Sequence, residues 1–369
     1  MRTLRHKSVP WTSAGVLAGA LLLSACSSSP SEPAASSPAP EESSTSAAPS
    51  EAPKARTIGV AAITLASPNV PLQINSIKAA AKALGWTVVV LDANGDPAKM
   101  AADMSALVNQ GVDAILDIAE NPSQTMAGMT AAKEKGIPII AIGAPLIDPT
   151  NFASATYAPS DAKMSEMLAE QLLKQFPGES KALSLDASAI LALKIRKDTL
   201  VEKTAGRVTV AQAHETDLAN AVQDTVSAVT NTMRANPDIN MIWGLQDFEF
   251  SSSIQVLKSL NKLDTVGVYS YYMDPINFDL LRAAKGTNQR LAVVDSPIQD
   301  FPWYAMDALV NKFILNKTDW VTDTSIFEAP YTLVTPETVP ATGTALEYPS
   351  FSDFFLARWK DAGVTLTTG

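Results

Sequence analysis

Side chains suited to catalysis are scarce in this sequence. After residue 26 the only histidine is His214, in the run Ala-Gln-Ala-His-Glu-Thr, and neither Gly-x-Ser-x-Gly, a metal-ligand spacing nor a Gly-rich phosphate loop occurs. Nucleophilic triads and His-metal sites need more than one such group. A carboxylate pair such as Asp186 with Asp295 could still perform acid-base work. We nevertheless expect no enzymatic activity, no metal and no cofactor.

The only cysteine, Cys26, points to a different chemistry. It follows three basic residues near the N terminus, an apolar stretch from Val16 to Leu23 and the run Leu-Ser-Ala, as in bacterial lipoprotein signals. The apolar stretch is shorter than the roughly 20 residues that a membrane-spanning helix needs. We therefore predict that residues 1–26 direct export and that Cys26 carries a lipid that anchors the protein to the outer face of the cell membrane.

Composition separates a tether from a folded body. Residues 27–56 are mostly Ser, Pro, Ala and Glu, with no Leu, Ile, Val or aromatic residue, so they cannot bury enough surface to fold. The formal net charge of the whole chain is -10, and residues 1–25 contain three of its basic residues and no acidic one. Without a basic stripe, nucleic acid is excluded as a partner, and so is anionic lipid unless the covalent anchor is present.

After the tether, short β-branched runs alternate with helical patterns, which is typical of parallel sheets covered by helices on both faces. The pattern predicts helices at 74–84, from Pro97 to Gly111 and at 123–135. The expected strands are 57–63, 86–91, 114–118 and 137–142 in a first half, and 181–185, 207–213, 241–244, 265–269 and 291–295 in a second half.

The order of several short segments resembles a known family. These are Ile58-Gly-Val, Leu-Gly-Trp-Thr-Val-Val-Val-Leu-Asp92, Gln110-Gly-Val-Asp-Ala-Ile115, Lys135-Gly-Ile-Pro-Ile-Ile140, Ala235-Asn-Pro-Asp238 and Thr265-Val-Gly267. Over roughly residues 57–335 the chain is similar to the type I periplasmic binding proteins, and most similar to the ribose- and galactose-binding members that serve ABC transporters. No single motif carries the resemblance, which rests on their order and spacing.

The resemblance implies an α/β fold of two Rossmann-like lobes with parallel sheets, joined by three crossover segments, with the ligand cleft between the lobes. We expect the crossings near Tyr157, Asp295 and Glu328. Aromatic residues beyond Thr335, the last four at helical spacing, predict that the C-terminal extension packs on the body as a helix. The expected organisation is 1–26 lipoprotein signal peptide, 27–56 tether, 57–157 plus 296–328 N-terminal lobe, and 158–295 plus 329–369 C-terminal lobe with the extension.

Ligand contacts are expected in the loops that follow the strands. In the first lobe, Ser67-Pro68-Asn69-Val70 stands where sugar binders usually show Asn-Pro-aromatic, and Gly143-Ala144-Pro145 stands where ribose binders have an Asp-Arg pair. Asn69, Glu120 and Asn121 are the candidate polar contacts on this side.

In the second lobe, the resemblance points to Lys194, near a position where the family often has Arg, and to Gln246-Asp247, which match the family's Asn-Asp. Lys194 and its neighbour Arg196 are either ligating or merely solvated. Asp247 either contacts the ligand or caps a helix beginning near Ser251.

Two further positions depart from the family. Tyr269 stands where an Asp is usual, and Asp295 replaces a Gln that touches the ligand at a crossing; the alternative is that Asp295 caps the turn at Ser296-Pro297. Several other aromatic residues stand near strand ends, and we expect at least one to line the cleft, giving a site that is less charged and more aromatic than a ribose site. They are Phe248, Phe250, Tyr271 and Tyr272.

The resemblance implies capture of a small polar solute by lobe closure and its delivery to an ABC transporter permease. A sugar or polyol is the expected solute, and a non-sugar solute bearing an aromatic group is an alternative. A ligand-sensing receptor for a membrane signalling protein is a second alternative, which the sequence does not separate from transport. We expect the protein to be a monomer. Its expected partners are the permease and the membrane, to which the lipid anchor attaches it.

Overall fold

The computed structural model describes residues 54–67, 69–120, 122–143, 152–188, 190–320 and 330–367. The predicted signal peptide, Cys26 and nearly all of the tether lie outside these residues. Within the part of the chain that the structure describes, no helix is long and apolar enough to cross a bilayer.

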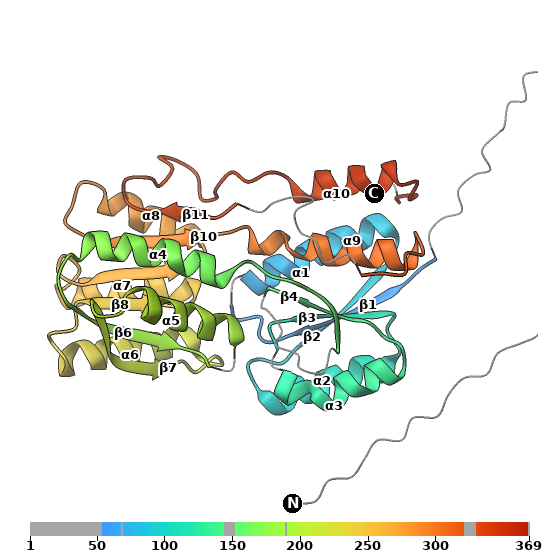
Figure 1. The fold of residues 1–369 in the computed structure, drawn as a ribbon, viewed down its shortest axis with the longest axis horizontal. Helices are drawn as coiled ribbons and strands as arrows, with labels where there is room; N and C mark the ends of the chain where they lie inside the picture. Colours follow the sequence, from blue (N-terminus) through green and yellow to red (C-terminus); the bar gives the residue numbers. More distant parts are fainter. Residues whose placement is uncertain are drawn as a thin grey trace, which may run out of the picture. The chain divides into compact units, whose positions relative to one another are not determined.

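The first lobe is built on a five-stranded parallel sheet with the order β2-β1-β3-β4-β5. Strand β1 alternates between two cores, because Ile58 and Val60 face one side and Ala61 faces the other. Helices α1 and α9 cover the first face, and α2 and α3 cover the second (Figure 1). The bounds are β1 Thr57–Ala62, α1 Asn69–Leu84, β2 Thr87–Asp92, α2 Pro97–Gln110, β3 Ala114–Ile118, α3 Pro122–Glu134, β4 Ile139–Ile142, β5 Ala153–Tyr157 and α9 Pro302–Phe313.

The second lobe is built on a six-stranded sheet with the order β11-β10-β9-β8-β6-β7, in which only β11 is antiparallel. Helices α4 and α5 pack on one face, and α6, α7 and α8 pack on the other. The bounds are α4 Asp161–Gln175, β6 Ser180–Asp186, α5 Leu191–Lys203, β7 Val208–Glu215, α6 Ala221–Ala235, β8 Met241–Gly244, α7 Asp247–Ser259, β9 Gly267–Tyr271, α8 Pro275–Ala284, β10 Leu291–Asp295, the 3-10 turn η1 Ile298–Asp300 and β11 Thr332–Val334.

The chain passes between the lobes where the sequence predicts. It leaves the first sheet after β5, which ends at Tyr157, and returns to the first lobe after β10, which ends at Asp295. The third passage lies between α9 and β11, and Glu328 itself is outside the described residues.

The C-terminal extension adds a fourth passage. Strand β11 pairs with β10 in the second lobe, whereas helix α10 (Phe351–Asp361) packs on α9 and α1 in the first. Phe355 is fully buried there, with its ring edge-on to Tyr304 at 5.3 Å, and the indole Nε1 of Trp359 donates to Asp307 over 2.8 Å. The helix that the aromatic spacing predicts is thus confirmed. Its assignment to the C-terminal lobe is wrong, because the apolar surface that receives these rings belongs to α9 and α1.

Candidate functional site

One cavity, of about 70 Å³, is lined by residues of both lobes. From the first lobe come the ends of β1, β3 and β4 and the first turns of α1, and from the second come α5 and the ends of β8 and β9. Ile298, in the segment that leads from β10 back to the first lobe, completes the lining. Every strand that contributes does so at its carboxyl end, where loops and helix N termini present unpaired N–H groups. We call this cavity the interlobe pocket.

The first lobe supplies two amide side chains from one helix. Asn69 is the first residue of α1, and Gln73 follows one turn later on the buried stripe of the same helix. Gln73 is only 3% exposed, and its Oε1 accepts no hydrogen bond within the described part of the chain. A side chain at Gly143, the end of the strand β4 segment, would collide with that oxygen, since an added Cβ would lie 2.8 Å from it.

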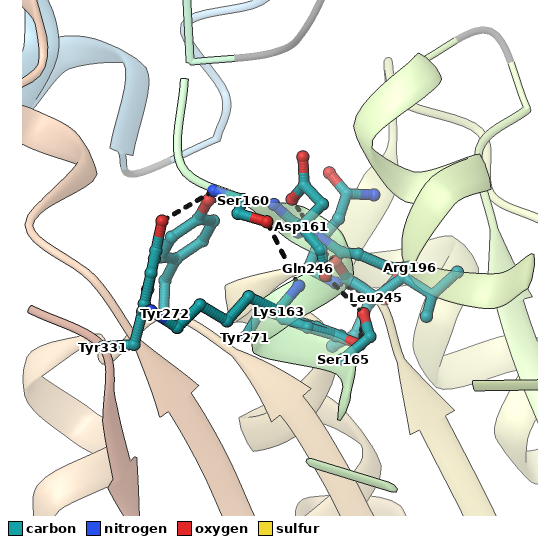
Figure 2. A network of polar contacts seen from close by, with 11 residues as sticks. Ser160, Asp161, Lys163, Ser165, Arg196, Leu245, Gln246, Tyr271, Tyr272 and Tyr331 are labelled. Atoms are coloured by element: carbon teal, nitrogen blue, oxygen red, sulfur yellow. Dashed lines mark hydrogen bonds and ion pairs between the residues drawn. The ribbon is translucent and has the colours of Figure 1, made fainter. Parts of the chain in front are cut away.

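The second lobe contributes a buried arginine (Figure 2). Arg196 of α5 donates from Nε to Asp161 over 2.7 Å, from Nη1 to the Leu245 carbonyl over 2.5 Å and from Nη2 to the Tyr272 hydroxyl over 2.9 Å. Its guanidinium carbon lies 4.6 Å from the Tyr271 ring centroid and 4.9 Å from that of Tyr272. Burial disfavours the charged guanidinium, but Tyr272 and Asp161 outweigh it, so the pKa of Arg196 is raised and the side chain stays cationic.

The Arg196 ion pair neutralises both charges locally. Asp161 is 2% exposed, and burial raises its pKa while Arg196 acts in the opposite direction. A buried charge without a partner would be strongly unfavourable. The guanidinium therefore faces the pocket as a hydrogen-bond donor whose charge is already balanced by Asp161.

Asp247 lies where the two lobes touch. It begins α7, and its Oδ1 accepts from the backbone N–H of Phe248 over 2.8 Å. Its Oδ2 accepts from Nδ2 of Asn69 in the opposite lobe. Burial, reinforced by Asp274, raises the pKa of Asp247 to about 7. The carboxyl is therefore both a helix-terminus group and a pocket residue, and it exchanges its proton near neutral pH.

Gln246 precedes α7 and is one of the residues that line the pocket. Its side-chain oxygen and the carboxylate of Glu249 form a reciprocal capping box at the start of the helix. Its Nε2 has no hydrogen-bond partner among the described residues, although the side chain is only 8% exposed. Burial raises the pKa of Glu249 to about 8.

Two non-glycine pocket residues have left-handed backbone. Ala119, which follows β3, has φ of 62°, and Tyr272, which follows β9, has φ of 64°. Such conformations are unfavourable for residues with a Cβ and are found most often at functional sites. Each lobe thus presents a strained backbone position to the pocket.

Three of the predicted contacts line the pocket, namely Asn69, Gln246 and Asp247. Lys194 does not: it is exposed, pairs with Asp198 and lies beside a separate hollow on the second lobe. Arg196, two residues after Lys194 in α5, lines the pocket instead. Asn121 lies outside the described residues.

The structure places the other predicted contacts away from the pocket. Tyr269 is fully buried in the core of the second lobe and donates to Gln175, because β9 continues to residue 271 and the loop begins only at Tyr272. Glu120 is buried beside Asp117 and does not line the pocket. Burial and the Asp117 charge raise the pKa of Glu120 to about 9.

Asp295 binds the C-terminal extension through a hydrogen bond from Tyr348 and does not line the pocket. Its Oδ1 accepts from the Met273 backbone N–H over 2.7 Å and its Oδ2 from the Tyr348 hydroxyl over 2.6 Å. Both oxygens are therefore occupied by this chain's own donors, and Asp295 is not among the residues that line the pocket.

One of the aromatic residues expected at the site lines the pocket. Phe248, Phe250 and Tyr271 are buried without lining the pocket, and Tyr272 is the aromatic residue among those that line it. The residue that sequence reasoning missed is Gln73. The signal for it was present, since a polar residue interrupts the buried stripe of α1 one turn after Asn69.

Comparison with known proteins supports this geometry. The family model for the periplasmic binding protein domain matches residues 58–314. This is a family of binding proteins and not of enzymes.

The ribose import binding protein RbsB of Bacillus subtilis (strain 168) is 33% identical over 86 residues, which are 23% of this chain and 28% of that protein. The xylitol-binding protein of Mycolicibacterium smegmatis (strain ATCC 700084 / mc(2)155) is 33% identical over 96 residues, which are 25% and 27% of the two chains. This chain thus matches less than a third of the length of either relative.

Solved structures share the fold across most of this chain. An ABC transporter solute binding protein from Agrobacterium vitis with bound allitol has a TM-score of 0.67 at 21% identity, covering 78% of this chain and 97% of that one. One from Mycobacterium smegmatis with bound glycerol has a TM-score of 0.68 at 20% identity, covering 79% and 100%. At these identities the likeness shows the two-lobed fold.

Proposed function

Since this chain belongs to the periplasmic binding protein domain family, we propose that it captures a neutral, hydroxylated solute in the interlobe pocket and delivers it to an ABC importer. The observation that carries the proposal is the pocket itself, which places amide, carboxyl and guanidinium groups of both lobes around one cavity. A solute that contacts both lobes favours their closure over it.

Charge balance argues for a neutral solute. Arg196 is compensated by Asp161, and the Asp247 carboxyl titrates near pH 7 because of its burial. A phosphate or carboxylate on the ligand would find the guanidinium already paired with Asp161. Hydroxyl groups, which donate and accept, suit both side chains without leaving a buried charge unpaired.

The relatives support a sugar or polyol. Their descriptions mention ribose import, xylitol, allitol and glycerol, all of which are neutral and hydroxylated. Delivery to an ABC importer is likewise supported by the description of the structural neighbours as ABC transporter solute binding proteins.

The hydrogen bond between Asn69 and Asp247 joins the two lobes at the pocket. In this structure the amide of the first lobe already donates to the carboxyl of the second. A ligand hydroxyl entering the pocket can replace either partner, so the polar groups that hold the lobes together also receive the solute.

For localisation, the proposal keeps the lipid anchor. Export agrees with the family, and the Leu-Ser-Ala-Cys26 sequence supports lipidation at Cys26 with residues 27–56 as the tether. Replacing Cys26 by Ala should release the protein from the membrane fraction; continued partition into detergent would contradict the anchor.

The binding proposal is tested by calorimetric titration of the purified protein with neutral sugars and polyols and with the phosphate esters of the same compounds. Neutral compounds should bind and the esters should not. Asp247→Ala should weaken binding about 10- to 150-fold, the loss expected for a hydrogen bond to a charged group. Lys194→Ala, an exposed change on the side of α5 opposite Arg196, is the matched control and should bind normally. Equal affinity for the phosphate esters would refute the proposal.

A further inference from the structure

The interlobe pocket offers no uncovered aromatic face within the described residues. Tyr272 is the aromatic residue that lines it, and the Arg196 guanidinium lies over that ring while donating to its hydroxyl. At the start of α1 the pocket is lined by Asn69 and Val70, neither of which is aromatic.

This arrangement discriminates between cyclic and open-chain ligands. A pyranose or furanose ring has an apolar C–H face that binding sites cover with an aromatic plane. An acyclic polyol has no such face, because its hydroxyls project all around a slender carbon chain.

The polar groups left without partners have the complementary chemistry. Gln73 of the first lobe presents an acceptor, Oε1, and Gln246 of the second presents a donor, Nε2; both atoms are buried and accept or donate no hydrogen bond within the described chain. The oxygen of Gln246 is held by the capping box, so its amide nitrogen is the atom left over. A hydroxyl is the group that can serve both an acceptor and a donor.

Gln73 has this position because of Gly143. The backbone there has φ of 75°, which favours glycine, and any side chain would meet the Gln73 oxygen. The neutral amide of Gln73 from α1 therefore occupies space that a side chain at this position would need.

We propose that the interlobe pocket is selective for acyclic polyols over cyclic sugars, and that Gln73 is the specificity-determining residue that accepts a polyol hydroxyl. The proposal rests on the proposed function, since it names the solute class for the same pocket.

The first test compares matched pairs by calorimetric titration: xylitol with D-xylose, ribitol with D-ribose and galactitol with D-galactose. Each pair has the same number of carbon atoms, so the ring is the main difference. In the pair that binds best, the polyol should bind at least about tenfold more tightly than its aldose. An aldose that binds as tightly as its polyol overturns the selectivity while leaving the proposed function in place. Binding of neither series overturns both.

The second test concerns Gln73. Gln73→Leu removes the acceptor at similar volume and should weaken binding of the best polyol about 3- to 10-fold. Because the lost oxygen has no hydrogen-bond partner among the described residues, the melting temperature of the ligand-free variant should stay the same or rise. Gln124→Leu is the matched control, since Gln124 also has an unpaired Oε1 on the first lobe but does not line the pocket. Unchanged polyol affinity in Gln73→Leu, or a fall in its melting temperature with the affinity of the folded fraction intact, would overturn the role of Gln73.

Discussion

Replacing Arg196 by Met tests whether the buried ion pair organises the second lobe's side of the pocket. Met fills much of the volume but removes the donors to Asp161, Leu245 and Tyr272. The second oxygen of Asp161 has no hydrogen-bond partner within the described chain, so the carboxyl depends on Arg196. Breaking a buried pair by removing one partner destabilises proteins by about 3–5 kcal/mol, and we expect a loss of that size here.

The loss should depend on pH. Without Arg196, burial alone acts on Asp161 and raises its pKa further. A carboxyl whose folded-state pKa lies above the unfolded value near 4 binds more protons when folded, so its contribution to stability is lost as the pH rises through the folded-state pKa. The destabilisation relative to the unmodified protein should therefore be larger at pH 8 than at pH 5.

Urea denaturation followed by tryptophan fluorescence at both pH values measures these free energies. The double variant with Arg196→Met and Asp161→Asn removes the orphaned charge and should recover at least half of the loss at pH 8. A loss below about 1 kcal/mol for Arg196→Met, equal at the two pH values, would refute the account of the pair.

Three further predictions concern the extension and the buried acids. Phe355→Ala should destabilise the protein by about 3–5 kcal/mol in urea denaturation, whereas the half-buried neighbour in Phe354→Ala should cost clearly less; equal losses would contradict the docking of α10. Tyr348→Phe leaves one oxygen of the buried Asp295 without its donor and should lower stability by about 1.5–3 kcal/mol with no change in ligand affinity, and a weaker affinity in titration would return Asp295 to the site. Because burial raises the pKa of Glu249 to about 8, its contribution should be lost as the pH rises from 5 to 8.5, and Glu249→Gln should flatten the slope of stability against pH; an unchanged slope would exclude Glu249 as its source.

The sequence alone determined the fold. β-Branched runs with the length typical of buried strands, alternating with helical stripes, specify parallel α/β units because the inner strands of such sheets are apolar on both faces. Local chemistry fixed these elements, which is why Gly111 and Gly136 end their helices where the pattern predicts. That order also carries the resemblance to the binding-protein family, which implied the two lobes and the contacts at Gln246 and Asp247.

Which other side chains reach the pocket was decided by tertiary structure. Lys194 and Arg196 are two residues apart, and two helical steps of about 100° place them on opposite sides of α5, so only the rotation of the docked helix selects between them. Whether Tyr269 or Tyr272 reaches the pocket also depends on tertiary structure, because the pairing of β9 with β10 sets where β9 ends.

Asp295 shows the limit of local reasoning most clearly. Its position at a strand end and a lobe crossing is readable from the sequence, but its partner, Tyr348, is 53 residues away in an extension that passes back between the lobes. A carboxylate bonds to whichever donor the folded chain brings within reach. The donor that Asp295 meets depends on contacts between residues distant in sequence, and neither the residue pattern nor the composition reveals those contacts.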